Sequence, residues 1–110
     1  MTYDEELADR VLEHFAGRHD LTRRRMFGGL CVMLGGHMAC GIVGETLMLR
    51  LGAEGTAQAL AEAHVREMDF TGKPMAGMVY VDPPGLRTDT QLGAWLDRAA
   101  AFVATLPAKR

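Results

Sequence analysis

Residues 30–51 decide the fold, and they read LCVMLGGHMACGIVGETLMLRL. A Gly-Gly pair between two runs of apolar residues is a strong signal for a tight β-hairpin, because glycine readily adopts the left-handed backbone that such turns need. Gly44-Glu45 marks a second and weaker turn. The stretch therefore predicts three consecutive antiparallel strands, over residues 30–34, 37–43 and 46–51.

The two turns fix the registers that we expect between these strands. A two-residue loop at 35–36 places Cys31 opposite Cys40, and a loop at 44–45 places Cys40 opposite Leu49. Because strand side chains alternate between two faces, the large apolar residues would then gather on one face. That face is expected to carry Cys31, Met33, Met38, Cys40, Ile42, Leu47, Leu49 and Leu51. The second face is expected to carry Val32, His37, Ala39, Gly41, Val43, Thr46, Met48 and Arg50.

Helices and a second pair of strands complete the expected fold. Apolar residues at helical spacing predict one helix that includes residues 7–15 and another that includes residues 92–106, and Thr88 and Gln91 can form a capping box at the start of the second. The alanine-rich residues 54–63 predict a short third helix. Residues 67–70 and 75–81 are typical of strands on either side of a turn. The order α-β-β-β-α-β-β-α predicts an α+β domain in which helices pack on an antiparallel sheet.

Composition and charge bound what the chain can do. Its 110 residues are 48% hydrophobic and 24% charged, which is typical of one soluble globular domain, expected here over residues 1–110. The formal net charge of −2 argues against direct nucleic-acid binding, which needs many cationic contacts to phosphate. The acidic N-terminal segment and only two cysteines favour a cytoplasmic location, since secretory signals begin with basic residues. Six glycines within residues 26–44 favour turns over a membrane-spanning helix.

The two cysteines are a candidate redox site. If Cys31 and Cys40 face each other across the hairpin, their α-carbons lie within the span of a disulfide, and the chain would work as a thiol redox sensor. The alternative is a pair of buried thiols that pack as small apolar side chains and react poorly. The sequence leaves both interpretations open.

A run of arginines is a candidate anion site. Arg23 and Arg25 share a face if their segment is a strand, and together with Arg50 they could hold the phosphate or carboxylate of a small ligand. The alternative is a solvated strand edge, on which charge prevents aggregation.

No metal site, cofactor or catalytic residue is expected. His37, Cys40, Met33 and Met38 are close in sequence, but the expected registers place His37 on the face away from the other three. A soft metal needs ligands that converge on one point. The chain contains no serine, and none of its histidines lies beside a nucleophile in the expected registers. The sequence therefore predicts a protein that is not an enzyme.

Two segments resemble a known family, the N-terminal domain of TfoX/Sxy proteins. They are RRMFGGLCVMLGGHMACGIVGETLMLRLG (residues 24–52) and MDFTGKPMAGMVYVDPPGL (residues 68–86). The resemblance implies an α+β fold similar to that of secretion chaperones. It also implies a bacterial regulator of natural competence that acts with a transcription regulator as its protein partner. Named members carry a second, C-terminal domain, so this chain is expected to be a stand-alone N-terminal domain.

The resemblance implies no catalytic residue. The residues that carry it are instead expected to serve turns, bulges and packing. They are Met26, Phe27, Gly28, Gly29, Met68, Asp69, Phe70, Gly72 and Pro74.

Together these observations favour a non-catalytic interaction or regulatory module that acts through protein–protein contacts. We expect a homodimer, because a second sheet face with Val32, Ala39, Val43 and Met48 is partly apolar and needs a cover. Two alternatives stay open, namely the small-anion-binding protein and the thiol redox sensor.

Overall fold

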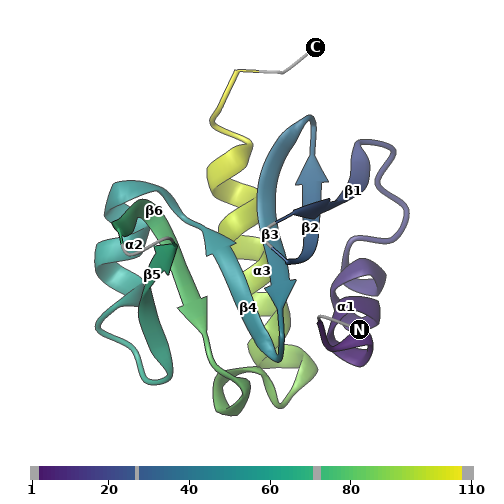
Figure 1. Ribbon diagram of the computed structural model, residues 1–110. Helices are drawn as coiled ribbons and strands as arrows, with labels where there is room; N and C mark the ends of the chain where they lie inside the picture. The colour runs from purple at the N-terminus through teal and green to yellow at the C-terminus, as the bar shows by residue number, and fades with distance from the viewer. Residues whose placement is uncertain (1–2, 27, 71–72, 108–110) are drawn as a thin grey trace.

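The computed structural model describes residues 3–26, 28–70 and 73–107. Within these ranges, three α-helices pack on one face of a six-stranded antiparallel sheet with the strand order β1-β2-β3-β4-β6-β5 (Figure 1). The helices are α1 (Glu5–His14), α2 (Gly52–Ala59) and α3 (Asp89–Val103), and a short 3₁₀ helix, η1 (Pro83–Leu86), precedes α3. The strands are β1 (Leu21–Met26), β2 (Gly29–Leu34), β3 (His37–Val43), β4 (Thr46–Arg50), β5 (Val65–Phe70) and β6 (Lys73–Val81). None of the described helices is long and apolar enough to cross a membrane.

The predicted α+β class is confirmed, and the structure adds one strand to the predicted order. This strand, β1, contains the arginine run and pairs along its whole length with β2 at the edge of the sheet. A solvent-exposed edge strand shows little apolar alternation, so hydrophobic periodicity does not reveal it. The observed order of helices and strands is α-β-β-β-β-α-β-β-α, with η1 before the last helix.

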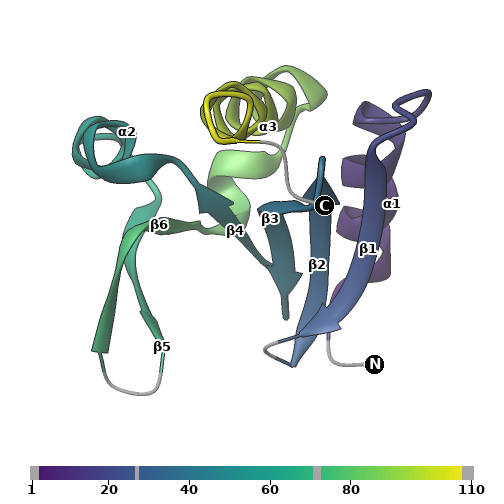
Figure 2. The same ribbon diagram turned by 90° about the horizontal axis from the view of Figure 1, so that it is seen from above.

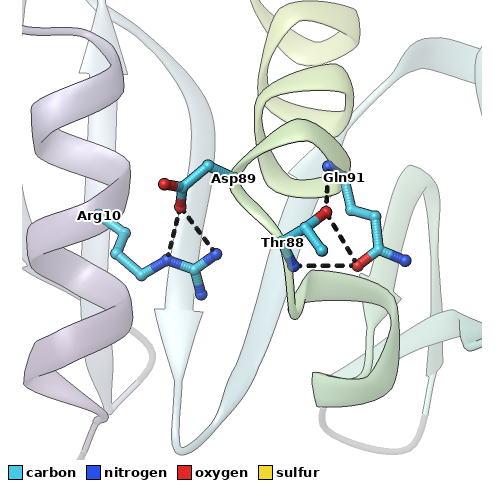
Figure 3. Close-up of polar contacts among 4 residues, drawn as sticks. All are labelled: Arg10, Thr88, Asp89 and Gln91. Carbon is cyan, nitrogen blue, oxygen red and sulfur yellow. Dashed lines mark hydrogen bonds and ion pairs between the residues drawn. The ribbon is translucent and has the colours of Figure 1, made fainter.

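Side chains cap the starts of the two longer helices. The Asp4 carboxylate accepts hydrogen bonds from the backbone N–H groups of Glu6 and Leu7 at the start of α1. At the start of α3, the Thr88 hydroxyl accepts from the Gln91 N–H, and the Gln91 side chain accepts from the Thr88 N–H (Figure 3). Such a cap stabilises a helix by about 1 kcal/mol, and here it fixes where the helix that covers the sheet begins.

A β-bulge changes the register between β2 and β3. The expected pairing holds beside the turn, but β3 then contains an extra residue, Ala39. Beyond it, Cys31 pairs with Gly41, and Cys40 pairs with Val32. The prediction that the two cysteines face each other is therefore wrong, because one extra residue in a strand exchanges the faces of everything that follows.

The bulge also redistributes the two predicted faces. The register between β3 and β4 is as predicted, with Cys40 opposite Leu49 and Ile42 opposite Leu47, and all four residues lie on the helix-covered face. Three residues predicted for that face lie on the other one: Cys31, Met33 and Met38. Two residues predicted for the second face lie in the helix-covered core instead: Val32 and Ala39.

The sheet separates two apolar clusters. The helix-covered core joins side chains of the helices to one face of the sheet, and Val11, Leu49 and Leu96 are among its fully buried members. The second cluster, which we call the methionine face, contains only strand residues among those described. Its members are Cys31, Met48, Met68 and Met78, which are buried, and Met26, Met33, Met38, Val43 and Tyr80, which are partly buried. Figure 2 shows the helices on one side of the bent sheet, with only strands on the other side.

Candidate functional site

The methionine face is the side of the sheet over which the described residues place no helix. Its centre is closed, since Cys31 and Met48 are 0% exposed. Its partly open portion includes Met26, Met33 and Met38, which lie on the neighbouring strands β1, β2 and β3. Methionine side chains are unbranched and polarizable, so a surface built from them can adapt its shape to a partner.

Gly41 makes room in the middle of this face. It is paired with Cys31 on one side and with Met48 on the other. A β-carbon added at Gly41 would lie 2.5 Å from the terminal methyl carbon of Met48 and 3.4 Å from the Cys31 sulfur. The two neighbouring side chains therefore converge above the glycine, and a larger residue there would displace them.

Both segments that carry the family resemblance contribute to the methionine face, Met26 from the first and Met68 from the second. Between β1 and β2, Gly28 has a φ of +74°, a left-handed conformation that glycine adopts without strain. A β-carbon at Gly29 would collide with the backbone carbonyl oxygen of Ile42. Phe27 and Gly72 lie outside the described residues, as do the side chains of Asp69, Phe70 and Pro74.

The two thiols lie on opposite faces of the sheet. Cys31 belongs to the methionine face, Cys40 belongs to the helix-covered core, and both are fully buried free cysteines. Burial raises the pKa of both thiols and so disfavours the reactive thiolate. The geometry on which the redox-sensor hypothesis rested is absent.

The three arginines of the expected anion site are not brought together. Arg23 and Arg25 are exposed and share a face of the edge strand β1. Arg50 lies on β4, three strands away, which is about 14 Å at the usual strand spacing. Its guanidinium carbon lies 5.9 Å from the centre of the Phe102 ring instead.

A pocket of about 310 Å³ lies between α1 and α3. Arg10 donates hydrogen bonds from two nitrogens, at 3.3 and 3.2 Å, to one oxygen of Asp89 (Figure 3). The His14 ring nitrogen lies 2.8 Å from an Asp97 oxygen. A β-carbon at Gly93 would be 3.1 Å from the His14 ring, so the glycine lets the helices approach closely. These pairs hold the two helices together, and we assign no chemistry to the pocket.

His37 has a structural partner in the segment that follows α3. Its Nε2 lies 2.5 Å from the carbonyl oxygen of Pro107, whereas Met33 and Met38 belong to the methionine face. The sequence placed Cys40 with these methionines, and the structure places it in the other cluster. In the described part of the chain, no three His, Cys, Asp or Glu side chains are grouped closely enough to hold a metal ion.

These features define a small α+β domain with a two-sided sheet, one side covered by helices and the other rich in methionine. A family model described as the TfoX N-terminal domain matches residues 13–103 of the 110-residue chain. The protein therefore belongs to the TfoX N-terminal domain family. No curated protein and no solved structure matches the chain at a significant level.

Sequence reasoning missed the methionine face because it did not anticipate the bulge at Ala39. The available signal was the run of small residues Ala39-Cys40-Gly41 inside a strand, since a glycine within a strand often marks a bulge. The eight methionines of the chain indicated an adaptable surface or a methionine-rich core without locating either.

Proposed function

We propose that this chain is a non-catalytic interaction module that regulates a partner protein by binding it at the methionine face. One observation carries the proposal: an apolar cluster is built from strand residues only, with none contributed by a described helix. Partly exposed apolar surface is unfavourable in water, and a bound partner removes it from water. Membership in the TfoX N-terminal domain family supports a regulatory role.

The contacts and burial of the ionisable side chains, among the described residues, support the proposal of a module without catalysis. His14 is engaged with Asp97, and Arg10 with Asp89, in contacts that join helices. Both thiols are buried, with pKa values raised by that burial. Nucleophilic catalysis needs an activated nucleophile beside a base, and the described hydrogen bonds contain no such pair.

The size of the methionine face limits the binding free energy that this face contributes alone. Fully burying one methionine side chain is worth about 1.5–3 kcal/mol, so completing the burial of Met26, Met33 and Met38 contributes on the order of 3 kcal/mol. A micromolar complex needs about 8 kcal/mol. The partner must therefore make further contacts beside these methionines.

The identity of the partner and the oligomeric state are separate parts of the proposal. The family resemblance favours a transcription regulator as partner. The homodimer stays a prediction, although Val32 and Ala39, which supported it, lie in the helix-covered core. Light scattering tests it: twice the chain mass of 12.0 kDa at high concentration supports a homodimer, and a monomer contradicts one.

Site-specific photo-crosslinking in native cells tests the proposed contact. A crosslinking amino acid replaces Met33 in one variant and Leu60 in another, since Leu60 is an apolar residue, 40% exposed, at the end of α2. We expect a discrete adduct with another protein from position 33 and not from position 60. Met38→Glu should abolish the adduct, and Leu60→Glu should leave it unchanged.

The adduct is then identified by mass spectrometry and rebuilt from purified proteins. The proposal is supported if the purified partner binds the chain and if Met38→Glu weakens this binding whereas Leu60→Glu does not. Equal adducts from both positions, or none from position 33, contradict it. An adduct between two copies of this chain assigns the face to a homodimer and contradicts a different partner there.

A further inference from the structure

β1 is an open edge of the sheet. It forms six regular pairs with β2, from Leu21 opposite Leu34 to Met26 opposite Gly29, without a register shift. In the described sheet no strand lies on its other side (Figure 2). An edge strand in an antiparallel sheet directs about half of its backbone N–H and C=O groups outward, where they can pair with an added strand. The preceding helix, α1, packs chiefly against α3 and β3 rather than against β1.

The middle of this edge is a strip of positive charge. Arg23, Arg24 and Arg25 are all exposed, and no ion pair within the described ranges involves them. The arginines that do have carboxylate partners are Arg10, Arg18, Arg66 and Arg98. The strip therefore stands out in a chain whose net charge is −2.

The strip lies on both sides of the strand. Arg23 and Arg25 are paired with residues of the helix-covered core, whereas Arg24 is paired with Cys31 of the methionine face. Antiparallel pairing of β1 with β1 of a second copy would set arginine against arginine, which is unfavourable. One charged residue would suffice to disfavour pairing with the edge strand of another molecule. Three consecutive arginines, directed to both faces, are instead complementary in charge to an acidic strand.

We propose that β1 accepts an extended acidic segment of a partner protein, which adds to the sheet as a seventh strand. Its carboxylates would face Arg23, Arg24 and Arg25, and backbone hydrogen bonds to β1 would supply sequence-independent affinity. An apolar residue of the same segment would pack beside Met26, the β1 member of the methionine face. The inference rests on the proposed function and supplies the further contacts that the methionines need.

Peptide binding to the purified chain tests this inference. The probe is a fluorescent peptide with three consecutive glutamates between β-branched residues, followed by fluorescence anisotropy and by hydrogen exchange of the β1 amides. We expect saturable binding and slower exchange in β1. Arg24→Glu should weaken binding by roughly tenfold or more. Arg87→Glu, the same charge change at an exposed residue after η1, should leave binding unchanged.

Four further probes separate strand addition from simple charge attraction. A peptide with a central proline, which cannot pair along the strand, should lose binding, and a lysine peptide should bind Arg24→Glu better than the wild-type chain. Equal binding of the proline peptide would overturn the proposal. So would competition by inorganic phosphate or a single-stranded oligonucleotide at the concentration of the acidic peptide. If the acidic peptide does not bind but the crosslinked adduct from position 33 still forms, this inference is contradicted and the proposed function is not.

Discussion

Cys31 lies opposite Gly41 across the β2–β3 hairpin, while Cys40 lies opposite Val32. The bulge at Ala39 thus sends the two thiols to opposite faces of the sheet. The same change moves Met33 onto the face that also holds methionines from β4, β5 and β6. One inserted residue therefore removes the disulfide geometry and adds Cys31, Met33 and Met38 to the methionine face.

The separated thiols should not form an internal disulfide. Treatment of the native chain with oxidised glutathione should leave both cysteines free, since Cys31 and Cys40 lie on opposite faces. Alkylation at neutral pH should be slow until the chain is denatured, because burial raises both pKa values. Intact-mass spectrometry measures both, and loss of two hydrogen masses from the native monomer would contradict the separation.

Gly29→Ala should strongly destabilise the fold. The added β-carbon would strike the backbone carbonyl oxygen of Ile42, which cannot move without disturbing the β2–β3 pairing. We expect a loss of about 3 kcal/mol or more in the free energy of unfolding, measured by urea titration. Gly93→Ala is the matched control: it gains helix propensity and meets only the His14 ring, so stability should change by about 1 kcal/mol at most.

Alanine substitutions should distinguish the closed part of the methionine face from its open part, because they should lower the stability of the fold by different amounts. Met68 is 0% exposed, so Met68→Ala should cost about 2–5 kcal/mol of stability. Met33 is only partly buried, and Met33→Ala should cost clearly less in the same urea titration. Met68→Leu, which nearly conserves volume, should cost less than about 1.5 kcal/mol. Equal losses for the two alanine variants would show that the two parts are not distinct.

The Arg66–Asp82 pair should make part of the stability depend on pH. Two guanidinium nitrogens each lie 2.8 Å from an Asp82 oxygen, and these hydrogen bonds hold the pKa of that carboxyl below its usual value. Because the folded pKa is the lower one, the stabilisation is complete above the unfolded pKa of about 3.9 and is lost as pH falls through the folded pKa. The side chains are 54% and 30% exposed, so screening limits the contribution to about 1 kcal/mol.

Urea unfolding from neutral to acid pH measures this contribution. Asp82→Asn and Arg66→Met should each reduce the loss of stability in acid by the same amount, and the double variant should add nothing further. Part of the acid dependence should remain, because Arg18 likewise lowers the pKa of Asp20. An unchanged acid profile in Asp82→Asn would contradict a coupled pair.

Local sequence signals predicted what depends on neighbours in the chain. The Thr88–Gln91 capping box forms as expected, and the register of Ile42 opposite Leu47 follows from the turn at Gly44-Glu45. Both depend on a few adjacent residues whose conformations are strongly restricted.

The remaining features depend on contacts between distant segments. β1 is a strand because it pairs with β2, since its own arginines show no buried side. The methionine face needs Met68 and Met78 from the second hairpin, which only the assembled sheet brings to Cys31. Neither the bulge at Ala39 nor this assembly follows from periodicity, because both depend on which face of the sheet finally meets the helices.

The openness of the methionine face can be measured directly by NMR of the chain with ¹³C-labelled methionine methyl groups and a soluble paramagnetic probe. We expect strong broadening of the Met26, Met33 and Met38 signals and weak broadening of the Met48, Met68 and Met78 signals. Uniformly weak broadening of all six signals would mean that the face is already covered, and it would contradict the claim that this face is available to a partner.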